Sequence, residues 1–296
     1  MGSKTNIAWT DATDNPVFLL RDDGTNGGHW CQKTDPACAN CYAESVNQND
    51  FFQFASHLPY TGKPPENLHF DRAIVEAWAR KTKPSMRFVC SMTDLFGEWV
   101  PRQWQFAVFD AALAAPLQII QLLTKRPAIA AQAAREWCES RGQFLLPENV
   151  WLGVSVGDQQ AANRFRGDAW LMWQFSQITW VSYEPAWGLV DWAGWEFINW
   201  LVIGGESGPN AREFDLAWGE AAIAWCRKHK IPPYMKQLGS KAVVQVHDCH
   251  QPPDNWAPFG SSGKGTNISE WPGGLRVREF PVQFSADYLA ARGKAA

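Results

Sequence analysis

Short apolar runs alternate along this chain with segments whose apolar residues recur at helical spacing. Short apolar runs bounded by turn residues predict strands, and apolar positions three or four residues apart predict helices. The strands predicted in this way are residues 7–10, 87–91, 117–124, 150–156, 178–183, 200–203 and 232–238. The predicted helices are residues 43–54, 68–81, 102–114, 127–140, 159–165 and 215–228, with Asp215 as the N-cap of the last.

Strands that alternate regularly with helices indicate βα units and a parallel sheet, which places the chain in the α/β class. No Rossmann-type glycine fingerprint follows the first predicted strand, so the pattern favours a partial or nearly closed TIM-like (β/α) barrel over a doubly wound sheet. We expect residues 1–240 to form this barrel. Residues 241–296 are rich in Pro, Gly and Trp and predict a loop-rich C-terminal closing segment.

Composition narrows the classes of partner and compartment. Hydrophobic residues make up 46% of the 296 residues, charged residues only 19%, and the formal net charge is −3, so no electrostatic footprint for duplex DNA or an anionic membrane is present. No stretch reaches the roughly 20 apolar residues of a membrane span, and the N-terminus does not resemble a secretory signal. Seven unevenly spaced cysteines argue against a disulfide framework and favour a reducing cytoplasm.

Three of these cysteines, Cys31, Cys38 and Cys41, fall within eleven residues, in a Cys-x6-Cys-x2-Cys arrangement. This spacing allows three thiolates to converge on one metal centre. A structural zinc ion needs four ligands, and iron–sulfur clusters normally use four thiolates. Three cysteines therefore favour an iron–sulfur cluster with one iron open to a small molecule.

Other interpretations of the cysteines stay open. A zinc site completed by His29 or Cys90 is the main alternative. Cys38 and Cys41 form a redox pair only beside a thioredoxin-like βα unit, which the flanking residues do not resemble. Simple packing of these cysteines near a loop is the remaining alternative.

Active sites of (β/α) barrels lie at the carboxyl ends of the strands. Polar or charged residues end the predicted strands here, and we expect them to line a polar pocket. The alternative is that they are polar only because loops after strands are exposed to solvent. They are Ser91, Asp94, Lys125, Arg126, Ser155, Glu184, Glu206, Arg212, Lys236 and Gln237. The segment Gly204-Gly205-Glu206 is the most specific: the glycine N–H groups suit a carboxylate or phosphate, and Glu206 suits an ammonium group. A glycine turn with a solvated glutamate is the alternative.

The three-cysteine loop followed by βα units resembles the radical S-adenosylmethionine superfamily, and more closely a radical-SAM-like family of uncharacterised phage and bacterial proteins. The resembling segments are residues 9–16, 36–44, 91–96, 123–127, 151–156, 182–185, 203–209, 236–239 and 275–281. Two features depart from the superfamily: its usual first cysteine gap is three residues, not six, and its Gly-Gly-Glu motif usually ends the second strand.

This resemblance implies a [4Fe–4S] cluster on Cys31, Cys38 and Cys41, with S-adenosylmethionine bound to the open iron. It also implies reductive cleavage of S-adenosylmethionine to a 5′-deoxyadenosyl radical, with the electron supplied by an external flavodoxin- or ferredoxin-like donor. The residues expected to bind cofactor are Tyr42, Ser91, Asp94, Ser155, Gly204, Gly205, Glu206, Arg212 and Lys236, and those expected in catalysis are Glu184, Lys125 and Glu206. Because the Gly-Gly-Glu motif comes late, it suits substrate, with Ser91 or Asp94 nearer the methionyl group.

The substrate expected from this resemblance is a nucleotide, an exposed nucleobase or another small molecule, with DNA as a partner and no membrane. Loops rich in tryptophan suit base stacking. A concrete version is the rearrangement of an amino-acid adduct on thymine during phage DNA hypermodification, in the host cytoplasm. The alternatives are radical modification of a peptide, repair of a DNA lesion, and a zinc or iron–sulfur interaction protein without catalysis.

Overall fold

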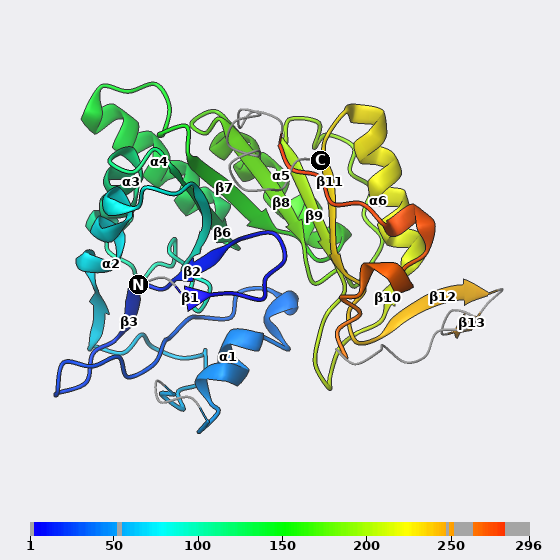
Figure 1. Cartoon of the computed structure of the whole chain (residues 1–296), viewed down its shortest axis with the longest axis horizontal. Coiled ribbons are helices and arrows are strands. Elements are labelled where there is room, and N and C mark those ends of the chain that lie inside the picture. The colour runs from blue at the N-terminus through cyan, green and yellow to red at the C-terminus, as the bar shows by residue number, and fades with distance from the viewer. Residues whose placement is uncertain (1–2, 52–54, 247–248, 252–262, 282–296) are drawn as a thin grey trace. The chain divides into compact units, whose positions relative to one another are not determined.

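The computed structural model describes residues 3–51, 55–246, 249–251 and 263–281 (Figure 1). The chain forms two compact units, which are described separately. Unit 1 comprises residues 1–153 and 168–178, and unit 2 comprises residues 154–167 and 179–296. Residues 241–296 belong to unit 2, and the division at residue 240 stays a prediction.

Unit 1 is built on a sheet with the strand order β1-β2-β5-β6-β7. Its strands are β1 (Ser3–Lys4), β2 (Ala12–Asp14), β5 (Ser85–Val89), β6 (Gln118–Thr124) and β7 (Val150–Ser155), whose last two residues fall in unit 2. The β2–β5 and β5–β6 pairs are parallel, and β1 runs antiparallel to β2. Residues of β6 and β7 are almost all buried, as is typical of parallel strands covered on both faces.

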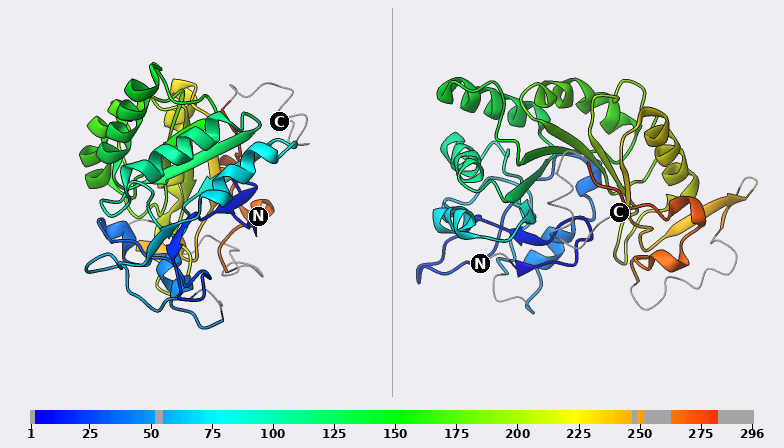
Figure 2. Two further views of the ribbon diagram at one scale, coloured as in Figure 1. Left: turned by 90° about the vertical axis from the view of Figure 1, so that its left-hand side faces the viewer. Right: turned by 45° about the horizontal axis from the view of Figure 1, so that its top comes forward.

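Three helices of unit 1 supply the second layer of its core. They are α2 (Arg72–Glu76), α3 (Arg102–Leu113) and α4 (Pro127–Arg141), which lie side by side in Figure 2. Large side chains fill the space between these helices and the strands, among them Trp78, Phe109 and Trp137. The indole N–H of Trp137 donates to Asp110 Oδ1 at 2.9 Å, so this buried ring keeps a polar partner.

The cysteine segment of unit 1 contains little regular structure. It includes the 3-10 helix η1 (Pro36–Cys38) and the short helix α1 (Tyr42–Asn47), near the two-stranded sheet of β3 (Val17–Leu19) and β4 (Leu68–Phe70). The predicted helix over 43–54 is therefore shorter, and residues 52–54 lie outside the described residues.

The predicted helix over residues 68–81 is wrong at its start. Residues 68–70 form β4, and the helix begins only after Asp71, whose carboxylate accepts from Ala73 N at 2.9 Å and caps α2. A 3-10 turn, η2 (Ala77–Arg80), then replaces the end of the expected helix. Apolar spacing alone did not distinguish a three-residue strand from the first turn of a helix.

Unit 2 contains the parallel strands β8 (Ile178–Tyr183, whose first residue falls in unit 1), β9 (Trp200–Gly204) and β11 (Pro233–Gln237), in the order β8-β9-β11. Helix α6 (Leu216–His229) packs against β9 and β11. Asp215 is its N-cap, as predicted, and accepts from Ala217 N at 3.0 Å. Strands β10 (Phe214–Asp215), β12 (Ala242–Val246) and β13 (Cys249–Gln251) form a further small sheet. The 3-10 turns η3 (Ile268–Glu270) and η4 (Gly273–Leu275) follow.

The α/β class and the succession of parallel βα units are confirmed, consistent with a TIM-like (β/α) barrel. Helix α5 (Gln159–Trp173) is longer than predicted and contributes residues to both units. The expected first strand over residues 7–10 is wrong: the strand is β2, at residues 12–14.

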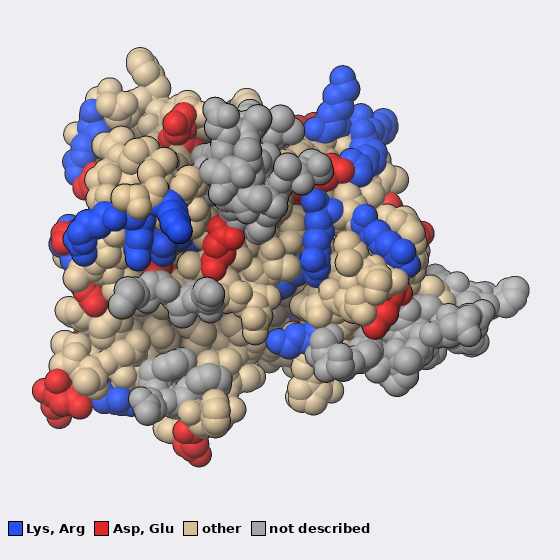
Figure 3. Space-filling model, in the orientation of Figure 1, with Lys and Arg blue, Asp and Glu red and all other residues tan. Residues whose placement is uncertain are grey.

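No helix within the described ranges is long and apolar enough to cross a membrane. On the face shown in Figure 3, acidic and basic side chains form small groups separated by uncharged surface.

Candidate functional site

The cysteine segment is shaped by local capping. Asp35 caps η1: its carboxylate accepts from Ala37 N at 2.8 Å, and its carbonyl accepts from Cys38 N at 2.8 Å. Cys41 is the residue before α1, and its carbonyl accepts from the amide of Ser45 at 3.1 Å. Cys38 therefore closes one helical turn and Cys41 opens the next. All three cysteines of the segment are partly exposed and reduced.

Both ends of the cysteine segment are fastened to residues 91–93, immediately after β5. The Thr93 hydroxyl donates to Trp30 O at 2.6 Å, next to Cys31. The Tyr42 hydroxyl donates to Ser91 O at 2.7 Å, next to Cys41. The structure thus brings together Tyr42 and Ser91, two residues that the sequence analysis assigned to one site.

Residues 90–93 are themselves fixed by the loop after β2. Cys90 has a φ of 61°, in the left-handed region that favours glycine, and its amide donates to Asp14 O at 2.9 Å. The side chain of Asn15 donates to Ser91 Oγ at 3.1 Å and accepts from Met92 N at 3.0 Å. A strained residue and a side-chain amide therefore set the turn that receives the cysteine segment.

Asp94 is buried, and donors of the protein surround its carboxylate. It accepts from the Thr124 hydroxyl at 2.8 Å, from Phe96 N at 3.0 Å and from Lys125 N at 3.1 Å. The Arg126 guanidinium lies 3.3 Å from its Oδ2. In this structure Asp94 thus joins the end of β6 to the turn after β5. The sequence analysis expected Asp94 to bind cofactor and did not predict this structural role.

Arg126 reaches from the end of β6 to the cysteine segment. Its Nε donates to Glu98 Oε2 at 2.7 Å, and its two terminal nitrogens donate to Asp94 Oδ2 at 3.3 Å and to Gln32 O at 3.2 Å. The guanidinium carbon lies 4.6 Å from the centre of the Trp99 ring. The sequence analysis placed Arg126 at a strand end, but nothing in the sequence indicated its bond to Gln32.

The thiols of the segment influence one another electrostatically. Burial, followed by the charges of Asp94 and Cys41, raises the pKa of Cys31 to about 12, while Arg126 acts in the opposite direction. Burial also raises the pKa of Cys41, and the positive charge of Lys125 lowers it. The positive charges of Arg126 and Lys125, at the end of β6, therefore partly offset the effect of burial on the pKa of Cys31 and Cys41 respectively. Such cations stabilise thiolates or an anionic cluster.

The donor set consists of three free thiols, Cys31, Cys38 and Cys41, the type of ligand that iron–sulfur clusters use. Among the residues that the structure describes, no three His, Cys, Asp or Glu side chains are gathered as the ligands of one metal ion. A cluster held by Cys31, Cys38 and Cys41 therefore stays a prediction from the sequence.

The two proposed fourth ligands for zinc are engaged elsewhere. The ring of His29 lies 2.9 Å from Val17 O, and burial lowers its pKa to about 4. Cys90 is buried in the hydrophobic core of unit 1.

In unit 2, the expected catalytic residue Glu184 follows β8. Its Oε1 lies 3.0 Å from Lys236 Nζ at the end of β11, and its Oε2 accepts from the Ser182 hydroxyl at 3.1 Å. The hydroxyl of Ser155 donates to Glu184 O at 2.9 Å. The structure therefore unites Ser155, Glu184 and Lys236, with Ser155 holding the backbone of Glu184.

The paired glycines after β9 allow close packing. A Cβ on Gly204 would lie 2.5 Å from Glu184 Oε1, and a Cβ on Gly205 would lie 2.3 Å from Leu238 O. The amide of Gly205 donates to Gln237 O at 3.2 Å. The lack of side chains at Gly204 and Gly205 therefore leaves room for the Glu184 carboxylate and for the backbone at Leu238. The Gly205 N–H is already bonded to Gln237 O within the protein.

Glu206 is buried and binds Arg212. The guanidinium donates to both carboxylate oxygens, from its terminal nitrogen at 2.8 Å and from Nε at 3.0 Å, and it lies 4.6 Å from the centre of the Trp187 ring. The partner of Glu206 in this structure is thus a guanidinium of the chain. Trp187 was not singled out by its sequence; a tryptophan between Glu184-Pro185 and Gly188 carries no specific signal.

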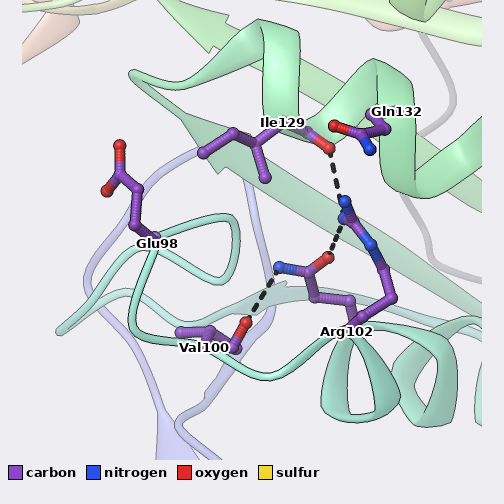
Figure 4. Close-up of a pocket in the computed structure, with 7 residues that line it drawn as sticks. Glu98, Val100, Arg102, Ile129 and Gln132 are labelled. Carbon is purple, nitrogen blue, oxygen red and sulfur yellow. Dashed lines mark hydrogen bonds between the residues drawn. The ribbon is translucent and has the colours of Figure 1, made fainter.

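A cavity of about 250 Å³ lies beside α3 and α4 in unit 1. It is lined by Gly97, Glu98, Val100, Arg102, Gln105, Ile129 and Gln132 (Figure 4). Arg102 spans it, with an ion pair to Glu136 at 2.8 Å and a hydrogen bond to Ile129 O at 3.4 Å. None of these residues was predicted as a site from the sequence.

A comparison with known protein families shows which family this chain belongs to. Residues 4–268 match the family described as "Protein of unknown function (DUF5131)". The chain belongs to this family. The match is to the DUF5131 family and not to a radical S-adenosylmethionine family, which corrects the resemblance drawn from the sequence motifs. Short motifs, such as three cysteines before βα units, are shared by unrelated families.

No curated protein matches this DUF5131 chain in sequence. Among solved structures, the chain is similar to the EAL enzyme Bd1971 in its cAMP- and cyclic-di-GMP-bound form, with 10% identity and a TM-score of 0.25. The alignment covers 79% of this chain and 55% of that one, so the chain spans about half the length of the structure it matches. A TM-score this low carries no argument about fold or function.

Proposed function

We propose that this protein is an enzyme in which Cys31, Cys38 and Cys41 hold a [4Fe–4S] cluster that leaves one iron open for S-adenosylmethionine. The proposal rests on the cysteine segment and not on membership of a known enzyme family. The observation that carries it is the fastening of both outer cysteines: Thr93 holds the carbonyl before Cys31, and Tyr42, the residue after Cys41, is anchored by its hydroxyl to Ser91 O. A fixed three-thiolate segment beside cations suits an anionic cluster.

Cys31, Cys38 and Cys41 would hold the cluster, and the chemistry that it would supply with S-adenosylmethionine is homolytic removal of a hydrogen atom from the substrate, driven by one electron from an external donor. The chain's own residues would bind and orient the cofactor and the substrate. The positive charge of Lys125 acts on Cys41. The Ser91 hydroxyl accepts a hydrogen bond from the Asn15 side chain, and the Ser91 carbonyl accepts one from the Tyr42 hydroxyl. These bonds keep the segment closed over the turn after β5, where the expected methionyl-binding residues lie.

Glu184 is the group that we propose for proton transfer in unit 2. Its carboxylate lies between the ammonium of Lys236, 3.0 Å away, and the hydroxyl of Ser182, which donates to it at 3.1 Å. A carboxylate–ammonium pair can accept and return a proton during a rearrangement. The proposed substrate class is a nucleobase or nucleotide, including an amino-acid adduct on thymine.

The experiment that tests the proposal is anaerobic reconstitution with iron and sulfide, followed by S-adenosylmethionine and dithionite. We expect about four irons per chain and release of 5′-deoxyadenosine. Both should be lost in Cys38→Ala and kept in Cys138→Ala, which removes a buried thiol of α4. Zinc in place of iron, or a cluster that never cleaves the cofactor, would contradict the proposal and favour a metal-binding protein without radical chemistry.

A further inference from the structure

Arg126 connects the cysteine segment to two acidic side chains. It is 7% exposed, and its three nitrogens contact three different acceptors: Glu98, Asp94 and Gln32 O. The acceptors belong to separate stretches of unit 1. Residues 94–98 follow β5, and Gln32 follows the first cysteine. One buried side chain thus joins the loops after β5 and β6 to the segment that carries the thiols.

The bond to Gln32 completes the anchoring of Cys31. The carbonyl before Cys31, Trp30 O, accepts from the Thr93 hydroxyl at 2.6 Å. The carbonyl after it, Gln32 O, accepts from Arg126 at 3.2 Å. With both neighbouring peptide groups held, the backbone that directs the Cys31 thiol has little freedom to rotate. Lys33 N adds a third bond, to Tyr60 O at 2.9 Å.

The guanidinium shape is required for this arrangement. A lysine ammonium is a compact point charge on a flexible stem and cannot hold three acceptors in fixed directions while lying over the Trp99 ring. Trp99 in turn packs edge-on against Trp30, with ring centres 4.9 Å apart. Arg126 therefore acts on the residue before Cys31 through Trp99 and on the residue after it through Gln32.

We infer that Arg126 is the positioning residue of the cysteine centre, fixing the loop at Gln32 and keeping a positive charge beside Cys31. The part of this inference that concerns charge rests on the proposed function, because it requires a bound cluster. The part that concerns the loop does not. A nearby cation favours the reduced, more negative state of a cluster and so raises its reduction potential.

The loop is tested on the metal-free chain by limited trypsin digestion at Lys33. Lys33 lies within the segment, and trypsin does not cut at Arg126 because Pro127 follows, so substitutions there leave the trypsin sites unchanged. We expect cleavage after Lys33 to be at least about tenfold faster in both Arg126→Gln and Arg126→Lys, since a charge-assisted hydrogen bond is lost. Arg102→Gln is the matched control: Arg102 pairs with Glu136, away from the cysteines, and the loss of the trypsin site at Arg102 leaves the site after Lys33 unchanged.

Arg126→Gln should fold, because Asp94 keeps its bonds from Thr124, Lys125 N and Phe96 N. Thermal melts followed by circular dichroism check this, and Arg126→Lys provides a second variant that keeps the charge. Cleavage at the wild-type rate in both Arg126 variants would overturn the positioning role, whichever metal the cysteines bind.

The charge is tested by the midpoint potential of the reconstituted cluster. We expect a lower potential in Arg126→Gln and a potential close to that of the wild type in Arg126→Lys and Arg102→Gln. Equal potentials in all four proteins would overturn the electrostatic role. If the wild-type chain binds no iron, the proposed function fails, while faster cleavage at Lys33 in the Arg126 variants still supports the loop role.

Discussion

The hydroxyl of Tyr42 donates to the carbonyl of Ser91 at 2.7 Å, although 49 residues separate them in the chain. Tyr42 follows the last cysteine of the segment, and Ser91 follows β5. A second tyrosine, Tyr60, donates to the next carbonyl, Met92 O, at 2.8 Å. Two tyrosines therefore bind neighbouring carbonyls of one turn from different environments, since Tyr42 is 51% exposed and Tyr60 is 2% exposed.

Replacing these tyrosines should have unequal effects. Tyr42→Phe removes a bond that water can replace, and we expect a loss of at most about 1 kcal/mol in the free energy of unfolding. Tyr60→Phe leaves Met92 O buried without this donor, and we expect a loss of about 1–3 kcal/mol. Urea denaturation measures both. An equal cost for the two variants would contradict the difference in burial.

Gly204→Ala should disturb the Glu184–Lys236 pair. The new methyl group would lie 2.5 Å from Glu184 Oε1, so the carboxylate must move away from its position. We expect a loss of about 1–3 kcal/mol of unfolding free energy, as for other overpacked sites.

Gly167→Ala is the matched control for Gly204→Ala. Gly167 lies in α5 with no atom within 4 Å of the added methyl group. This variant should gain about 0.5–1 kcal/mol through its lower backbone entropy in the unfolded chain. Similar denaturation midpoints for the two variants would show that Gly204 is not required for space.

Glu206→Gln should cost more stability than Glu213→Gln. Glu206 is buried and receives two bonds from the Arg212 guanidinium, whereas the Glu213–Lys241 pair at 3.0 Å is much more exposed. We expect about 1.5–3 kcal/mol for Glu206→Gln and less than about 1 kcal/mol for Glu213→Gln. Salt should reduce only the second effect. A Glu206→Gln protein as stable as the wild type would contradict the structural role of this pair.

Stability should fall at alkaline pH because buried tyrosines resist ionisation. Burial raises the pKa of Tyr234 from 10.0 to about 12, and it raises the pKa of Tyr183 and Tyr60 as well. A group whose pKa is raised by folding stabilises the protein below its unfolded pKa. That contribution is lost as the pH rises from about 10 towards 12.

Denaturation at several pH values measures this loss, together with tyrosinate absorbance. Tyr234→Phe should lose less stability between pH 10 and 12 than the wild type does. Tyr42→Phe is the control, because Tyr42 is half exposed. An identical pH dependence of the wild type and Tyr234→Phe would show that this ring does not contribute.

The sequence by itself determined the α/β class, the order of the parallel strands from β5 to β11 and the helices α3, α4 and α6. These elements are long or strongly periodic, so local apolar spacing is enough to predict them. The N-cap of α6 was also readable, because an aspartate before a helical pattern satisfies a free backbone N–H. For the candidate site, the sequence predicted only which polar and charged residues lie at the ends of strands.

Only the tertiary structure decided which partner each of these residues has. Arg126 reaches Gln32 O across 94 residues, and Lys236 reaches Glu184 across 52 positions of the sequence. Glu206 and Arg212 are close in the chain, yet their pairing depends on a bent loop that no periodicity encodes. Side-chain contacts of this kind depend on how distant strand ends meet, and that is fixed by packing of the whole sheet and not by local propensity.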